Sequence, residues 1–385
     1  MISYQEAQQI IQAHKRSFGE QLLKLRDSVG HVLAEDIIAD RDWPPFDRVA
    51  MDGIAIASNN IQDAKENYIF LKNGIQAAGS PRLANINAES CVEVMTGAVL
   101  PQNCDRVIPY EKVIDLKQSF SVKREDIQGK TNIHYKGSDQ SRGDVLINKG
   151  KRINLADIAI LASVGKSKVL VKSRPRVAVI STGDELVSVD MTPEYYQIRQ
   201  SNSEFLLADL PEAESFHLRD NKDELIEEIS RLKKEYDVLI FSGGVSKGKF
   251  DYLPEVFELL GIEKWFHKVA QRPGKPFWFG GDEQCVVFGF PGNPVSTFMC
   301  YQVYFKLWNE DAPEIKYARL AKDVVFKPNL TYFIPVRCNE EFWAHPVLTN
   351  GSGDFSALSK ANGIVILEAG KNLYKKGERY QIIEL

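Results

Sequence analysis

Three apolar runs, each followed at once by a turn of small residues, constrain the fold of this chain more than any other feature. The runs cover residues 177–180, 238–241 and 285–288. The turns after them read Ser-Thr-Gly-Asp-Glu at 181–185, Ser-Gly-Gly-Val-Ser at 242–246 and Gly-Phe-Pro-Gly-Asn-Pro at 289–294. Continuous apolar runs are typical of strands buried in a parallel sheet, and ligands bind where such strands end. We therefore predict that three glycine-bearing loops meet at one ligand site.

Size and composition limit the class of protein. A chain of 385 residues has room for two or more domains, and its 44% hydrophobic and 26% charged residues are ordinary for a folded globular protein. The net charge of -4 gives no support for nucleic-acid binding. No apolar run reaches the ~18 residues of a membrane span, and no basic segment leads into an apolar one at the N-terminus. We therefore expect a cytoplasmic protein without nucleic-acid or membrane partners.

The cysteines and histidines do not indicate metal or triad chemistry. The cysteines are odd in number and contain no Cys-x-x-Cys pair, which favours buried free thiols over a zinc site or a disulfide framework. The histidines are isolated, and no Ser-His-Asp or Cys-His order is present. The cysteines are Cys91, Cys104, Cys285, Cys300 and Cys338.

The patterning along the chain predicts an α/β multidomain protein. Residues 3–6 form a capping box that opens an N-terminal helix, and the patterned stretch 22–34 predicts a second one. Short β-type runs between glycine, proline and asparagine turns follow, and after them strands alternate with helices, which implies a sheet that is mostly parallel. The predicted domains are a discontinuous helical N-terminal domain (1–42 plus 138–173), a β-rich insert (43–137), a central α/β domain (174–312) and a C-terminal β-barrel-like domain (313–385).

Carboxylates follow two of the predicted strands. Asp184 and Glu185 lie on the first turn, and Asp251 comes soon after the second. Mg²⁺ favours oxygen ligands and shares them with substrate phosphates, so these three carboxylates predict a magnesium site. The alternative for Asp184 and Asp251 is a role as helix N-caps or turn residues.

The glycines in these loops permit an anion to approach the backbone. Gly243, Gly244 and Gly292 remove side chains where backbone N–H groups face a ligand at the start of a helix. Pro294 at a first helical position leaves the preceding N–H groups free for a ligand. We therefore predict that phosphate groups bind at these loops.

A cationic turn lies between the second and third loops in the sequence. Lys268, Arg272 and Lys275 surround a Pro-Gly pair between two apolar runs. Such a turn can hold a phosphate or another tetrahedral oxyanion. A solvated basic turn is the alternative, but the position of this turn between the two loops favours binding.

Six phrases together resemble the molybdopterin molybdenumtransferase family, which comprises MoeA in bacteria and the gephyrin E-domain in eukaryotes. The resemblance runs over nearly the whole chain, and the order of the phrases makes it specific. The phrases are Pro-Phe-Asp (45–47) with Met-Asp-Gly (51–53), Met-Thr-Gly (95–97), Ser-Thr-Gly-Asp-Glu-Leu (181–186), Ser-Gly-Gly-Val-Ser (242–246) with Asp-Tyr (251–252), Arg-Pro-Gly-Lys-Pro (272–276) and Pro-Gly-Asn-Pro-Val-Ser (291–296).

The resemblance implies a MoCF-type α/β domain, a homodimer and a specific reaction. Molybdate is inserted into adenylylated molybdopterin in the presence of Mg²⁺, and AMP is released. The active site lies across the dimer, so that Asp52 and Thr96 of one subunit face the α/β domain of the other. Molybdopterin adenylyltransferase and molybdoenzyme acceptors are the implied further partners.

The resemblance, together with the predicted binding of phosphate at the glycine loops, assigns roles to a larger set of residues. The implied catalytic residues are Asp52, Thr96, Asp139, Glu185, Asp220 and Asp251. The residues expected to bind molybdate or substrate are Lys268, Arg272, Lys275 and Ser296. The expected phosphate and pterin loops comprise Gly183, Ser242, Gly243, Gly244, Ser246, Pro291, Gly292 and Asn293.

The chain departs from the family at one of these positions. Arg272 stands where the family often has lysine, which keeps the charge but replaces a point charge with a planar fork.

Two other functions use similar loops: a molybdopterin adenylyltransferase and a non-enzymatic scaffold. The extra terminal domains argue against the first, and the set of catalytic carboxylates with Lys268 argues against the second.

Overall fold

The computed structural model describes residues 1–61, 65–83, 87–246, 251–309 and 315–385. It forms two compact units. The large unit comprises Met1–Phe18 and Arg174–Leu385, and the small unit comprises Gly19–Ser173. The division into four domains expected from the sequence is finer than this one and stays a prediction.

A six-stranded mixed sheet lies at the centre of the large unit, in the order β16-β13-β17-β21-β20-β18. The first four strands are parallel, and β20 runs antiparallel to both of its neighbours, β21 and β18, which confirms the mostly parallel sheet predicted from the apolar runs. The strands are β13 (Val177–Thr182), β16 (Glu214–Leu218), β17 (Val238–Ser242), β18 (Glu263–His267), β20 (Trp278–Gly281) and β21 (Val286–Phe290).

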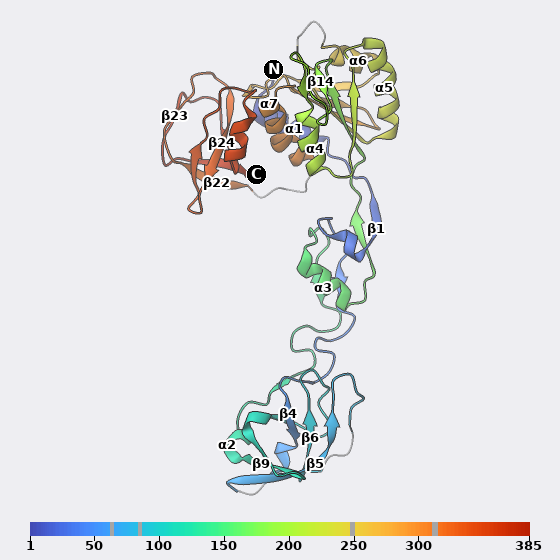
Figure 1. Ribbon diagram of the computed structural model, residues 1–385, viewed down its shortest axis with the longest axis vertical. Helices are drawn as coiled ribbons and strands as arrows, with labels where there is room; N and C mark the ends of the chain where they lie inside the picture. Colours follow the sequence, from blue (N-terminus) through green and yellow to red (C-terminus); the bar gives the residue numbers. More distant parts are fainter. Residues whose placement is uncertain (62–64, 84–86, 247–250, 310–314) are drawn as a thin grey trace. The chain divides into compact units, whose positions relative to one another are not determined.

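Helices cover both faces of this sheet (Figure 1). Val179 and Ile240 pack against α1, α4 and α7, while their neighbours Ile180 and Phe241 pack against α5 and α6. Because successive strand residues point to opposite faces, a run that is apolar throughout fills both cores. The helices are α1 (Tyr4–Ala13), α4 (Ser201–Asp209), α5 (Lys222–Glu235), α6 (Leu253–Leu259) and α7 (Pro294–Cys300), which continues through a π-helix (Tyr301–Phe305) into α8 (Lys306–Asn309).

Two helix starts agree with the signals in the sequence. The Ser3 side chain accepts a hydrogen bond from the backbone N–H of Glu6, whose carboxylate accepts one from the Ser3 backbone, so α1 begins with the predicted capping box. Pro294 is the first residue of α7, after Asn293 at the N-cap position.

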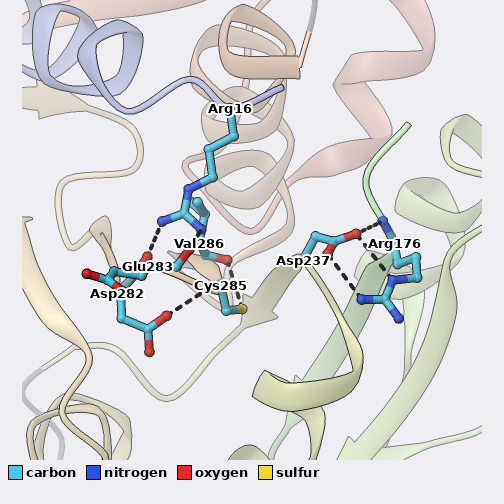
Figure 2. Close-up of polar contacts among 7 residues, drawn as sticks. All are labelled: Arg16, Arg176, Asp237, Asp282, Glu283, Cys285 and Val286. Atoms are coloured by element: carbon cyan, nitrogen blue, oxygen red, sulfur yellow. Dashed lines mark hydrogen bonds and ion pairs between the residues drawn. The ribbon is translucent and has the colours of Figure 1, made fainter. Parts of the chain in front are cut away.

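Polar contacts fix the amino ends of the strands, opposite the edge where the glycine loops lie (Figure 2). Arg176, next to the start of β13, donates to both carboxylate oxygens of Asp237, which precedes β17. Arg16, which follows α1, donates to the backbone carbonyl oxygens of Asp282 and Glu283 in the turn before β21. These contacts tie the N-terminal segment to the sheet.

The C-terminal part of the large unit is a closed five-stranded barrel, because β24 pairs with both β25 and β26. This confirms the barrel-like fold predicted for the end of the chain. Its strands are β22 (Lys316–Leu320), β24 (Thr331–Cys338), β25 (Trp343–Pro346), β26 (Gly363–Leu367) and β28 (Arg379–Glu384), with β19 (Gln271–Arg272) alongside β24 and a separate pair β23 (Val324–Val325) and β27 (Leu373–Tyr374).

The small unit contains a second six-stranded sheet in the order β7-β4-β6-β5-β9-β8. Its strands are β4 (Gly53–Ile56), β5 (Asn67–Gln76), β6 (Ser90–Val94), β7 (Arg106–Pro109), β8 (Val113–Asp115) and β9 (Ser119–Lys123). The small unit also contains two helices, α2 (Arg124–Ile127) and α3 (Leu155–Ser163). Three short antiparallel strand pairs complete it: β1 (Glu20–Lys24) with β12 (Lys168–Lys172), β2 (Ile37–Ile38) with β11 (Val145–Ile147), and β3 (Arg48–Val49) with β10 (Ile133–His134).

The second N-terminal helix predicted for residues 22–34 is wrong. The segment begins within β1 and continues as a single 3₁₀ turn, Leu25–Ser28. Antiparallel pairing of Leu22 and Leu23 with Leu170 and Val169 overrides the local helical pattern.

All five cysteines are free, and four of them are buried, as the sequence indicated. Burial raises the pKa of Cys91, Cys104 and Cys285 to about 12, so these thiols are unreactive at neutral pH. Within the described ranges, no helix is long and apolar enough to cross a membrane.

Candidate active site

One cavity lies at the carboxyl edge of the central sheet, where the three glycine-bearing loops end their strands. Its volume of about 420 Å³ suits a small-molecule ligand. The predicted residues that line it are Gly183, Glu185, Asp220, Ser242, Gly243, Gly244, Ser246, Asp251, Pro291, Gly292 and Asn293. The structure thus brings all three loops together, although Lys247 and Gly248 of the second loop lie outside the described residues.

The glycine loop after β17 packs directly against the end of β13. A Cβ on Gly244 would lie 2.9 Å from the Thr182 hydroxyl, and one on Gly292 would lie 3.5 Å from the Gly243 Cα. Gly243 and Gly244 both have positive φ angles, 106° and 67°, which glycine adopts at little cost. The absence of side chains therefore lets the second and third loops approach each other over the end of the sheet.

Three carboxylates that the sequence analysis selected share the cavity wall: Glu185, Asp220 and Asp251. Asp184 is exposed in the adjoining turn. Burial raises the pKa of Asp220 above its ordinary value, and the negative charges of Asp184, Glu185 and Asp251 raise it further. This mutual repulsion is an electrostatic environment that favours a divalent cation.

Neither Asp184 nor Asp251 caps a helix, but Asp184 is a turn residue, as the second half of that alternative states. Helix α6 begins after Tyr252, and no side chain caps it. Asp184 lies in a turn between β13 and the strand β14 (Leu186–Val187). Across the part of the chain that the structure describes, no group of three or more His, Cys, Asp or Glu side chains is placed so that it could hold a metal ion.

The cationic turn reaches the cavity through Pro276, which lines it, while Lys268, Arg272 and Lys275 do not. Arg272 and Lys275 are exposed and Lys268 is half-buried. Ser296 is buried in α7, with 4% of its surface exposed, and is not part of the lining. The structure thus brings the turn to the edge of the cavity without placing its cations in the wall.

Several cavity residues were not selected from the sequence. Thr182, Arg199 and Asn202 line the wall, the last two from β15 (Ile198–Arg199) and the start of α4. Ser352, in a loop after the barrel strand β25, accepts a hydrogen bond of 3.0 Å from the Asn293 amide. A helix that starts directly after a strand is the sequence signal that could have identified Asn202. Ser352 could be identified only from its packing.

In the small unit, Asp52 and Thr96 are joined. The backbone N–H and the hydroxyl of Thr96 donate to the same Asp52 carboxylate oxygen, at 2.6 and 2.8 Å. The backbone hydrogen bond first, and then the hydroxyl, lower the pKa of the exposed Asp52. The pair therefore presents a fixed, ionised carboxylate next to a threonine side chain.

Asp139 stands at the end of a polar chain in the same unit. Its carboxylate lies 2.8 Å from Nε2 of His134, and the Arg48 guanidinium lies 3.0 Å from the His134 Nδ1. Because Arg48 can only donate, the His134 ring presents its Nε2–H to Asp139. The sequence analysis missed His134, which β10 places opposite Arg48 on β3.

Three family models match successive parts of the chain. They are the MoeA N-terminal region (domain I and II) over residues 2–165, a probable molybdopterin binding domain over residues 178–310 and the MoeA C-terminal region (domain IV) over residues 317–385. With the cavity at the end of its central sheet, the fold defines a multidomain protein built around a molybdopterin-binding type of α/β domain.

Relatives cover the same full length. A protein named molybdopterin molybdenumtransferase from Synechocystis sp. is 42% identical over 98% of this chain and 98% of its own. A second with that name, from Staphylococcus epidermidis, is 34% identical over 94% of this chain and 90% of its own. A molybdopterin biosynthesis MoeA protein from Pyrococcus horikosii has a similar structure, with a TM-score of 0.83 and 29% identity over 100% of this chain and 99% of its own. The chain belongs to the MoeA family, which confirms the resemblance.

Proposed function

We propose that this chain is a molybdopterin molybdenumtransferase that inserts molybdate into adenylylated molybdopterin and releases AMP, the last step of molybdenum cofactor synthesis. Family membership over the whole chain supports this function. The observation that carries it is the convergence of three loops and three carboxylates, Glu185, Asp220 and Asp251, on one cavity. A substrate with a pterin, a phosphate bridge and a nucleoside requires such a site, where backbone and acidic groups meet.

The glycine loops bind the phosphates in this proposal. Gly243, Gly244 and Gly292 leave the backbone open along the wall, and Gly292 begins the segment that leads into α7. Backbone N–H groups at the start of a helix are suited to anions. These loops hold the nucleotide in place, so that the reacting sulfur and oxygen atoms of the substrates are positioned by the protein.

In this proposal one or two carboxylates of the group Glu185, Asp220 and Asp251 would hold Mg²⁺ together with the substrate phosphate. Burial, and then the neighbouring negative charges, raise the pKa of Asp220, and such a group of charges fits a divalent cation. Mg²⁺ commonly takes only one or two protein carboxylates alongside phosphate and water. When bound, the metal neutralises the phosphate charge and polarises the bond to AMP. Asp184, in the adjoining turn, adds negative charge to this group.

Lys268, Arg272 and Lys275 hold molybdate at the edge of the cavity. Pro276 joins this turn to the cavity wall. A doubly charged oxyanion needs cations that lie near the pterin but apart from the carboxylates. The protein supplies no nucleophile, because the dithiolene sulfurs and the oxyanion are themselves the reacting groups. Catalysis consists of positioning and charge stabilisation.

The active unit in this proposal is a homodimer with composite sites. Asp52, Thr96 and Asp139 belong to the small unit, where hydrogen bonds from Thr96 and His134 fix the exposed carboxylates of Asp52 and Asp139. We assign these carboxylates to the cavity of the second subunit. A twofold dimer, the commonest symmetry of soluble homo-oligomers, would contain two such sites.

Reconstitution tests the function. The purified protein is mixed with adenylylated molybdopterin, molybdate and Mg²⁺, and AMP and active cofactor are measured. We expect both products in the wild type and neither with Asp251→Ala, which removes a charge at a loop and no core volume. AMP release by Asp251→Ala at the wild-type rate would refute the magnesium assignment. Adenylylation of molybdopterin from ATP, with no AMP release from the adenylylated form, would instead identify an adenylyltransferase.

A further inference from the structure

Two buried polar atoms in the cavity wall have no hydrogen-bond partner among the residues that the structure describes. They are the Thr182 hydroxyl and the Asn202 side-chain carbonyl oxygen. Buried polar groups in folded proteins nearly always have a partner, and exceptions gather at sites that bind ligands. The roles assigned above to carboxylates, glycine loops and cations make no use of either atom.

The loop nearest Thr182 offers its buried hydroxyl no side-chain partner. The residue ends β13 and has 6% of its surface exposed. A Cβ on Gly243 would lie 3.0 Å from the hydroxyl oxygen and one on Gly244 would lie 2.9 Å from it. Gly243 and Gly244 are the two loop positions nearest to Thr182. Neither has a side chain that could form a hydrogen bond with the hydroxyl.

The orientation of Asn202 is fixed by its other end. Its Nδ2 donates a hydrogen bond of 2.8 Å to the Gly292 carbonyl oxygen. A carbonyl oxygen can only accept, so the amide nitrogen must point to Gly292 and the amide oxygen must point elsewhere. The cavity wall therefore presents an uncharged group that accepts hydrogen bonds and cannot donate them.

This chemistry excludes the anionic parts of the substrate as partners for Asn202. Phosphate and molybdate oxygens offer lone pairs but no protons at neutral pH, whereas the hydroxyls of a ribose and the N–H groups of a purine or pterin ring are donors. The Thr182 hydroxyl can donate or accept and suits the same groups. The wall thus contains two uncharged polar residues in addition to its carboxylates.

We propose that Thr182 and Asn202 bind the uncharged, proton-donating part of the substrate, a nucleoside or a pterin ring, and so select which substrate enters the cavity. The inference rests on the proposed function for the identity of that substrate. The shared chemistry is a hydroxyl or ring N–H donor, and two probes distinguish its source: AMP for the nucleoside and a 6-alkylpterin for the ring.

Binding and stability measured on the same variants test this inference. Thr182→Val keeps the shape of the side chain and removes the hydroxyl. Because that hydroxyl has no partner to lose among the described residues, we expect an unchanged or higher midpoint of thermal unfolding. We also expect at least one probe to bind about tenfold more weakly by calorimetry, as the loss of one hydrogen bond predicts. Thr182→Ser should bind as the wild type does, and Asn202→Leu should weaken the same probe.

Thr297→Val is the matched control for stability. The hydroxyl of this fully buried threonine already donates to the Pro291 carbonyl oxygen at 2.5 Å, so its removal should lower the unfolding midpoint. If Thr182→Val is destabilised in the same way and binds both probes as the wild type does, the hydroxyl is structural and the inference is refuted. Failure of the wild type to bind either probe refutes it as well. The reconstitution reaction judges the proposed function separately, because neither probe needs turnover to be bound.

Discussion

The side-chain amide nitrogen of Gln271 lies 3.0 Å from the carbonyl oxygen of Gly274, inside the turn that carries Arg272 and Lys275. Gln271 is 1% exposed, and its amide oxygen accepts a hydrogen bond from the Tyr304 hydroxyl in the π-helix that follows α7. π-helical turns are rare and often occur at functional sites. A buried glutamine thus fixes the backbone of an otherwise exposed cationic turn.

We predict that Gln271→Leu destabilises the protein and loosens this turn. The substitution leaves the Gly274 carbonyl and the Tyr304 hydroxyl buried without a partner, which costs about 1–3 kcal/mol. The apparent KM for molybdate should rise while AMP affinity stays the same, because the glycine loops are untouched. Chemical denaturation and AMP release against molybdate concentration check this. A drop in stability with an unchanged molybdate KM would limit Gln271 to a structural role.

Removing the cations themselves should act on molybdate more strongly. For Lys268→Ala and Arg272→Ala we expect a loss of roughly 1.5–3 kcal/mol, about tenfold to a hundredfold in apparent molybdate affinity, since each removes one charge-assisted contact. Arg272→Lys should be mild because it keeps the charge. The measurement is AMP release against molybdate at saturating pterin substrate. Weakened pterin binding with unchanged molybdate dependence in both alanine variants would reassign the turn to the phosphates.

Asp220→Asn should stabilise the protein at neutral pH and weaken Mg²⁺ binding. The pKa of Asp220 is raised in the folded state, so the folded protein loses stability as the pH rises from the ordinary carboxyl pKa through the raised value. The asparagine variant avoids this loss, which is small because solvent screens a half-buried group.

Thermal unfolding across pH, with and without Mg²⁺, checks the prediction for Asp220. The advantage of the variant should vanish near pH 3, where both forms are uncharged at this position. Mg²⁺ should raise the wild-type midpoint more than that of the variant. The exposed Asp190, outside the cavity, provides the control as Asp190→Asn, which should change neither quantity. An Asp220→Asn protein that is less stable than the wild type at pH 7 would contradict the electrostatic interpretation.

The composite site predicts that two inactive variants complement each other. In a mixture of Asp52→Ala and Asp251→Ala chains, one of the two sites of each mixed dimer carries neither substitution. With random mixing, half of the dimers are mixed, so we expect about a quarter of the wild-type AMP release per dimer. Tagged chains verify that mixed dimers form. If mixed dimers are present and no AMP release returns, Asp52 acts within its own subunit or outside the reaction.

Local sequence signals were sufficient for the main elements of the fold. The apolar runs of β13, β17 and β21 are long, β-branched and followed by glycine, so they could fill a buried parallel sheet and little else. The capping box of α1 and the proline that starts α7 likewise act through neighbouring residues. Residues 22–34 show the limit, because the local helical pattern yielded to pairing with a strand about 150 positions away.

The sequence by itself determined that glycine loops and carboxylates would gather at one sheet edge, since parallel strands must end together and glycine is required where backbones approach closely. The partners of individual side chains could not be predicted in this way. The fold leaves the Thr182 hydroxyl and the Asn202 side-chain oxygen without a hydrogen-bond partner among the described residues, places Ser352 of the barrel loop against Asn293, and orients His134 toward Asp139 through Arg48. The reason is physical: a hydrogen bond between residues tens of positions apart depends on packing in three dimensions, which leaves no periodic trace along the chain.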